Sequence, residues 1–252
     1  MDYIFDGSFN GYLCCVFEAF ERKEFLALPS VSGMASPHLF CESRTIHTDQ
    51  VKSKRVRQGM ERMLGKKRME LFYYNFLTDE KEAWALGFKL IVRLFKNGRM
   101  DMYNYGDPDL LKLHQIVKKV NRERHRVKAF VRFVKSSDEL YTAVIEPDFN
   151  VLPLVITFFK NRFTDQRWLI YDIRRAYGYH YDGKQVQEVT TSQGQDINDP
   201  HALLIDLDPK ELEFQHLWKT YFRNTNIQER KNIKLHLRHV PKRYWKYLTE
   251  KR

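Results

Sequence analysis

Apolar residues in the first half of the chain recur mainly every three or four positions, the spacing that places them on one face of an α-helix. Before the first such stretch, Tyr3–Phe5 has the pattern of a short strand, followed by a turn at Asp6–Gly7 and a helix N-cap at Ser8. The segment 26–47 contains prolines and glycine and is expected to be an irregular connection. A mainly helical N-terminal region is therefore predicted over 1–120, with helices over 9–20, 49–65, 82–95 and 107–126.

From residue 127 the pattern changes to the β-branched and aromatic enrichment of strands. Strands are predicted over 127–135 and 139–147, and a helix over 150–163. A hairpin is predicted over 167–190, because Asp182–Gly183 is a strong signal for a two-residue turn. These segments predict an antiparallel β-β-α-β-β unit in the middle of the chain.

Helical spacing returns near the C-terminus. A helix that opens at Asp208–Pro209 carries an apolar stripe, and a further helix leads to the terminal segment 241–248. The fold class predicted is α+β, with a helical N-terminal part, the antiparallel unit and a helical C-terminal cap. Residues 121–252 are expected to form an α+β region that is integrated with 1–120. The residues of the stripe are Phe214, Leu217, Trp218, Tyr221 and Phe222.

Composition and charge narrow the class of protein. Three cysteines are too few for a disulfide framework, and no secretory signal or membrane-length apolar run is present, so a cytoplasmic protein without a membrane partner is expected. The 43 Lys and Arg exceed the 32 Asp and Glu, which favours a polyanionic partner. The segments 51–68 and 118–135 each carry eight cations and one acid, and 210–252 carries twelve and four.

Five blocks of sequence, in order along the whole chain, resemble a family assigned to DNA repair or DNA metabolism whose function is not established. The bacterial genes of that family lie beside the gene of a radical-SAM DNA-modification protein, and a similar module is fused to uracil-DNA-glycosylase-like domains. The blocks are YIFDGSFNG (3–11), HRVKAFVRF (125–133), YTAVIEPDFNVLPL (141–154), FFKNRFTDQRWLIYD (158–172) and the segment 217–248.

The resemblance implies two partners, DNA and the radical-SAM protein. A radical-SAM enzyme holds its iron–sulfur cluster with a CxxxCxxC run, which this chain lacks. The cluster and SAM are therefore expected on the partner, and no cofactor is expected on this chain. The chain also has no recognisable glycosylase motif, so the resemblance favours an accessory or substrate-recognition component.

Cations and aromatic residues alternate in the terminal segment PKRYWKYL (241–248), as in surfaces that bind phosphates and stack bases. Alternatively, Tyr244, Tyr247 and Leu248 form an apolar stripe that anchors the chain end, and the cations are solvated. Upstream, three cations spaced four apart form either a phosphate-binding ridge or a solvated helix face. The candidate contacts are Arg230, Lys234, Arg238, Lys242, Arg243 and Trp245.

Arg132 is predicted to share a strand face with Phe130 and Val134, where an arginine requires an anionic partner. That partner is either a phosphate of DNA or an internal carboxylate, Glu146 or Asp148. Two arginines flank the turn between the predicted helix and the next strand, and they join Arg132 as candidate contacts. They are Arg162 and Arg167.

Glu146 and Asp148 lie on the same side of an extended segment and could form an acid–base or metal-binding pair. Together with His125 they are the candidate catalytic residues. The following strand lacks the acidic-x-Lys element of restriction-type nucleases, and Asp148 is alternatively the N-cap of the next helix. No metal site is predicted, because His236 and His239 have no supporting Cys or carboxylate cluster.

These patterns support one leading hypothesis and two alternatives. The leading hypothesis is a DNA-binding accessory protein that holds DNA through basic faces from 51–68, 122–135 and 230–246. The first alternative is an enzyme that acts directly on DNA, glycosylase-like or nuclease-like. The second is a protein-binding scaffold whose exposed aromatic residues are buried in a protein interface.

Overall fold

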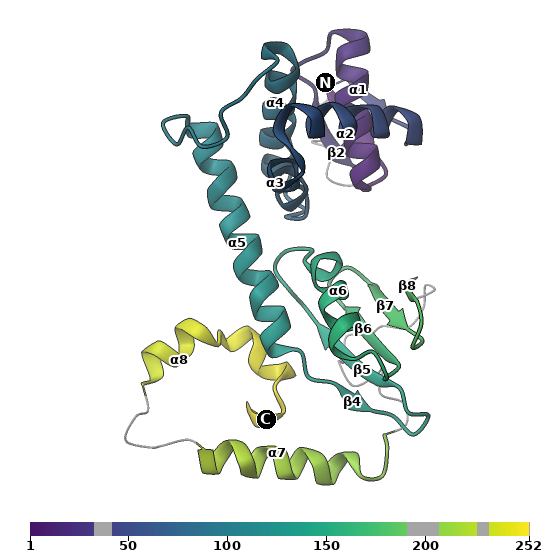
Figure 1. Ribbon diagram of the computed structural model, residues 1–252, viewed down its shortest axis with the longest axis vertical. Helices are drawn as coiled ribbons and strands as arrows, with labels where there is room; N and C mark the ends of the chain where they lie inside the picture. The colour runs from purple at the N-terminus through teal and green to yellow at the C-terminus, as the bar shows by residue number, and fades with distance from the viewer. Residues whose placement is uncertain (33–41, 191–206, 226–231, 252) are drawn as a thin grey trace. The chain divides into compact units, whose positions relative to one another are not determined.

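The computed structural model describes residues 1–32, 42–190, 207–225 and 232–251, and it contains α-helices and two β-sheets (Figure 1). This confirms the predicted α+β class. The chain forms two compact units, the N-terminal unit Met1–Arg122 and the C-terminal unit Glu123–Arg252. Among the described residues, no helix is long and apolar enough to cross a membrane.

The described part of the N-terminal unit combines α1 to α4 and the first part of α5 (Pro108–Phe130) with a small parallel sheet. In the sheet, β1 (Asp2–Phe5) lies between β2 (Leu28–Val31) and β3 (Ser43–Thr45). The predicted first strand and cap are confirmed, because the Ser8 hydroxyl accepts a hydrogen bond from the Gly11 amide at 2.9 Å. The helices that lie wholly in this unit are α1 (Phe9–Arg22), α2 (Gln50–Leu64), α3 (Lys66–Phe76) and α4 (Lys81–Asn97).

The irregular connection predicted over 26–47 is wrong in part, because it contains β2 and β3. Both strands are only three or four residues long, and Pro29 lies inside β2. A strand this short has too few positions to display the two-residue alternation from which strands are recognised. Pro29 is tolerated because β2 is an edge strand, where a missing amide donor can face solvent.

Aromatic rings form the core of the N-terminal unit. The Trp84 ring lies 5.3 Å from the ring of Phe5 and 5.7 Å from that of Phe76, measured between centroids. The indole N–H of Trp84 donates to the Phe76 carbonyl, and the Tyr12 hydroxyl donates to the Trp84 carbonyl, both at 2.8 Å. The polar atoms of these buried rings are therefore satisfied. Nine of the 17 residues of α4 are buried, so this helix belongs to the core.

The C-terminal unit is built on a five-stranded sheet in sequence order, from β4 to β8. The β-β-α part of the predicted order is confirmed, with α6 (Leu152–Arg162) between the second and third strands, but three strands follow α6 where the predicted hairpin has two. One pair differs from the predicted antiparallel sheet: β5 and β6 are parallel, because α6 returns the chain to the starting end of β5. The strands are β4 (Val134–Lys135), β5 (Tyr141–Ile145), β6 (Trp168–Asp172), β7 (Tyr177–Tyr181) and β8 (Val186–Thr190).

The strand predicted over 127–135 is wrong for its first half. Helix α5 (Pro108–Phe130) continues to Phe130, and β4 comprises only Val134–Lys135. A short apolar run suits either a helix or a strand, so its local pattern does not decide between them. The helix continues because Val127 extends the buried face that Val120 and Glu123 begin on α5.

The C-terminal part of the chain is helical and begins with α7 (Glu211–Thr225), which is followed by shorter helices. The stripe predicted on α7 divides: Trp218 and Phe222 face η3 (Thr249–Lys251), whereas Phe214, Leu217 and Tyr221 are exposed. This difference arises because only one side of α7 contacts other described elements. The remaining elements are α8 (Ile233–His239) and the 3₁₀-helix η2 (Lys242–Tyr247).

Two leucines of the C-terminal unit should differ sharply in their effect on stability. Leu248 is 1% exposed and Leu217 is 62% exposed. We expect Leu248→Ala to cost about 2–5 kcal/mol of unfolding free energy, because it leaves a cavity. Leu217→Ala should cost less than about 0.5 kcal/mol. Urea unfolding followed by tryptophan fluorescence measures both, and equal shifts of the midpoint would contradict the packing described here.

Candidate nucleic-acid interface

The end of α5 and the exposed side of α6, both labelled in Figure 1, carry cations near one aromatic ring. The Lys128 Nζ atom lies 4.7 Å from the centroid of the Phe158 ring, and 40% of Phe158 is exposed. Arg124 precedes Lys128 by one helical turn on α5, and Arg162 follows Phe158 by one turn on α6. We call these four residues the α5–α6 basic surface.

The helical period explains why these side chains point outward. On α5, Glu123 and Val127 are buried, and the residues that follow them, Arg124 and Lys128, are rotated by about 100° away from the core. On α6, Phe159 is buried, so the adjacent Phe158 cannot also face the core. Two consecutive phenylalanines in a helix with one buried face therefore leave one ring at the surface.

Lys128 occupies a partly buried position beside a second cation of the same helix. Burial lowers the pKa of Lys128, and the like charge of Arg124 lowers it further. Holding Lys128 protonated beside Arg124 therefore costs free energy. A phosphate close to both side chains would reverse that cost.

Arg132 is engaged inside the C-terminal unit. It lies in the loop between α5 and β4 rather than on the predicted strand, and its Nη2 atom is 2.7 Å from the Glu250 carboxylate. The Trp218 indole N–H also donates to Glu250, at 2.9 Å, and the Arg132 guanidinium lies over the Trp218 ring. The internal ion pair is thus the arrangement observed, although its acid is Glu250 instead of the predicted Glu146 or Asp148.

Glu250 is ionised at neutral pH because of these partners. Burial raises its pKa, but the hydrogen bonds from Arg132 and Trp218 outweigh that effect and hold the pKa below its usual value. The carboxylate therefore joins η3 to α7 and to the loop that precedes β4.

The terminal segment 241–248 is anchored to the C-terminal unit. Tyr244 and Leu248 are buried, which confirms the apolar-stripe interpretation. The Tyr244 hydroxyl donates to the buried Glu123, and Arg243 pairs with Glu123 and with Asp148, both at 2.6 Å. Arg243 is therefore bound to internal carboxylates rather than freely solvated.

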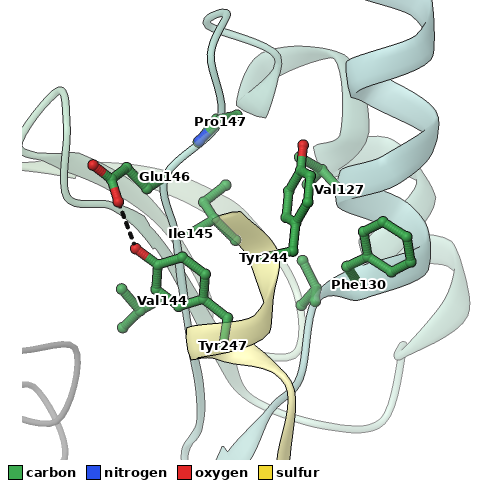
Figure 2. Close-up of a pocket in the computed structure, with 9 residues that line it drawn as sticks. Val127, Phe130, Val144, Ile145, Glu146, Pro147, Tyr244 and Tyr247 are labelled. Carbon is green, nitrogen blue, oxygen red and sulfur yellow. Dashed lines mark hydrogen bonds between the residues drawn. The ribbon is translucent and has the colours of Figure 1, made fainter. Parts of the chain in front are cut away.

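Figure 2 shows the second attachment of this segment, where the Tyr247 hydroxyl donates to Glu146 at 2.9 Å. Lys246 pairs with the same carboxylate. The hollow beside these residues has a volume of about 10 Å³, which is the space that a single water molecule requires. It is too small to receive a nucleobase. Its lining residues are Val127, Phe130, Val131, Val144, Ile145, Glu146, Pro147, Tyr244 and Tyr247.

The candidate catalytic residues do not form a shared acid–base pair. Hydrogen bonding from Lys246 holds the pKa of Glu146 below its usual value, and Asp148 is bound by Arg243. The alternative that Asp148 caps the next helix is wrong, since the N-cap of α6 is Val151. The backbone N–H of Asp148 instead donates to Glu123, at 3.0 Å. Both carboxylates thus serve to fasten η2.

His125 is exposed on α5, one turn from Lys128, so it borders the α5–α6 basic surface. Within the described ranges, no group of three or more His, Cys, Asp or Glu side chains is placed to hold a metal ion.

The other predicted contacts are distributed over the C-terminal unit. Arg167 is exposed and donates to the Asp138 carbonyl at 3.5 Å. The indole N–H of Trp245 donates to the Val240 carbonyl at 3.1 Å, and Lys251 lies over its ring. Arg230 lies outside the described residues. The remaining three are exposed on α8 and η2: Lys234, Arg238 and Lys242.

The basic segment 51–68 belongs to the N-terminal unit, where α2 and α3 present it. Part of its charge has internal partners, since Lys52 pairs with Glu18 at 2.6 Å and Arg57 donates to the Asn10 side chain at 2.8 Å. Other cations of the segment have exposed side chains: Lys54, Arg55, Arg62, Lys66, Lys67 and Arg68.

Sequence reasoning identified the basic segment of α5 and Arg162, but it missed three residues of the surface: Arg124, Lys128 and Phe158. Two signals could have found them. One is the repulsive pair of cations at i and i+4 on one helix, Arg124 and Lys128. The other is the pair Phe158–Phe159 in an amphipathic helix, of which only one ring can be buried.

The ion pair of Glu250 should make the stability of the protein depend on pH, and replacing Glu250 should remove that dependence. Because the pKa of Glu250 is lowered on folding, its contribution to stability is present above its usual value of 4.5 and is lost as the pH falls through the folded value. We expect Glu250→Gln to destabilise the protein by about 1–3 kcal/mol near neutral pH. The difference from the wild type should shrink in acid, as measured by urea unfolding.

A matched control is Glu139, whose side chain is 80% exposed and lies 3.7 Å from Lys135. Glu139→Gln should change stability by less than about 0.5 kcal/mol at every pH, because exposed ion pairs contribute little. If both variants behaved alike, Glu250 would not be a structural carboxylate.

Comparison with known proteins identifies a family without a known activity. The family described as a domain of unknown function, DUF4130, matches residues 81–250, which is more than half of the chain. No curated protein and no solved structure matches the chain. The match covers all of α5, the five-stranded sheet and the terminal helices as far as Glu250, so the chain belongs to the DUF4130 family.

Proposed function

We propose that the protein is a DNA-binding accessory factor in DNA repair or base modification, and that it acts with a radical-SAM partner. The observation that carries the DNA-binding part is the α5–α6 basic surface, where Lys128 lies 4.7 Å from the centroid of the exposed Phe158 ring and Arg162 is one helical turn away. The repair context and the partner are supported by the resemblance of the five sequence blocks. The iron–sulfur cluster and SAM belong to the partner in this proposal.

The chemistry of the surface suits a polyphosphate backbone. Each lysine or arginine that neutralises a phosphate releases condensed counterions, so affinity falls as salt rises. Lys128 and Arg162 lie on two helices and can contact successive phosphates rather than one. Contacts to phosphates carry no sequence information, so weak sequence selectivity is expected.

Direct catalysis on DNA receives less support from the structure. The candidate carboxylates Glu146 and Asp148 are both engaged by cations of η2. The hollow beside them is too small for a nucleobase. An accessory role therefore fits the geometry better than a glycosylase-like or nuclease-like site there.

A protein contact is a second function that one observation favours. Phe214, Leu217 and Tyr221 form an exposed apolar face on α7, and such faces mark sites of protein interaction. We assign this face to the radical-SAM partner. Co-purification of the two proteins should survive nuclease treatment and should be lost in Leu217→Asp.

The DNA-binding proposal is tested by titrating labelled DNA with the full chain between about 50 and 200 mM salt. Lys128→Gln should weaken binding to all sequences alike and reduce the slope of log K against log salt by about 0.7–0.9, the value of one phosphate contact. The control is Lys184→Gln, because Lys184 is exposed in the turn between β7 and β8. An absence of DNA binding by the wild type at low salt rejects the proposal.

A further inference from the structure

We infer that the α5–α6 basic surface receives a single-stranded polynucleotide, with one unpaired base stacked on Phe158 and the adjoining phosphates bound by Lys128 and Arg162. This inference rests on the proposed function and goes further, because it specifies the form of the nucleic acid.

The first argument concerns the ring itself. Phe158 is 40% exposed although it belongs to a helix with a well-formed buried face. Its ring contacts the buried ring of Phe159, with centroids 5.2 Å apart and planes at 77°. This edge-to-face contact holds the exposed ring in a defined orientation. Phe158 is therefore a preorganised flat surface rather than a loose side chain.

The second argument concerns what surrounds the ring. An exposed phenylalanine in a protein-binding patch is accompanied by other apolar side chains. Phe158 is accompanied by cations instead: Lys128 lies 4.7 Å from its centroid, and Arg162 is one helical turn away. Cations beside an aromatic surface are the combination that binds single strands, because bases stack on the ring while phosphates contact the cations.

The third argument separates a single strand from a duplex. The bases of a duplex are stacked on one another, so only the phosphates could reach this surface and Phe158 would make no contact with a base. A base flipped out of a duplex needs an enclosing pocket. Among the described residues, the hollow between α5, β5 and η2 has a volume of only about 10 Å³ and is too small to enclose a base. An open ring beside cations therefore fits an unpaired strand.

The surface offers no feature that distinguishes deoxyribose from ribose, since the recognising groups are a ring and cations. The shared chemistry is an unpaired, stacked base with its phosphate. DNA and RNA single strands are consequently both tested, and the proposed function in DNA repair or base modification makes DNA the expected ligand.

The experiment uses the full chain and three labelled probes in fluorescence anisotropy: oligo(dT) and oligo(rU) of about 15 nucleotides, within the range of known single-strand sites, and a DNA duplex of equal length. The wild type should bind oligo(dT) more tightly than the duplex. Phe158→Ala should weaken oligo(dT) binding about tenfold or more, the loss expected for one stacked base. Binding of the duplex should change less than about twofold, because only phosphates are contacted there.

Two further variants separate stacking from a change of structure. Phe158→Trp keeps a flat ring and should retain oligo(dT) affinity, whereas Phe158→Leu keeps apolar bulk without a ring and should behave like Phe158→Ala. The control is Tyr105→Ala, because Tyr105 is also an exposed aromatic residue but lies in the N-terminal unit. It should leave all three affinities unchanged.

The outcomes distinguish this inference from the proposed function. If the wild type binds the duplex with salt dependence but Phe158→Ala affects no probe, the inference is overturned and DNA binding stands. An equal loss on duplex and single strand also overturns it. If the wild type binds none of the probes, the proposed function itself fails. If Phe158→Ala weakened the binding of oligo(rU) alone, the ligand of the site would be single-stranded RNA, and the assignment to DNA would be overturned.

Discussion

The C-terminal unit depends on one buried carboxylate, that of Glu123. Only 2% of this residue is exposed, and a carboxylate removed from water is stable only if donors surround it. Its donors come from distant parts of the chain: the Tyr244 hydroxyl, the Arg243 guanidinium and the backbone N–H of Asp148. Glu123 therefore holds the terminal segment and the loop before α6 against α5. In doing so it fixes α5 beside α6, which is the arrangement that forms the basic surface.

Because of such internal ion pairs, the net charge of the chain overstates the positive charge that is available at its surface. A net charge of +11 suggests a generally cationic surface, but two arginines of the C-terminal unit, Arg132 and Arg243, neutralise internal acids. The cations that remain available on α5 and α6 are fewer and are more closely grouped. Specific contact with a polyanion follows from that grouping rather than from the total.

The features that were predicted correctly are those that depend on neighbouring residues alone. Ser8 caps a helix and Gly183 adopts φ +96° in a turn because their neighbours alone require it. The parallel pairing of β5 with β6 depends on where a helix returns the chain, and the acid that pairs with Arg132 lies 118 residues away. A local sequence pattern therefore predicts neither the strand pairing nor the partner of Arg132. At the candidate site, Arg162 was identified by its position, whereas Phe158 was missed because its exposure depends on which side of α6 meets the sheet.

The closeness of Arg124 and Lys128 lowers the stability of the free protein but favours the binding of an anion. The protonated lysine is disfavoured in the unbound protein, so the native state would gain stability if either cation became neutral. Selection for thermal robustness alone would remove one of them. The crowded position of Lys128 therefore makes the free protein less stable than it could be, and an anion bound beside it would restore that stability.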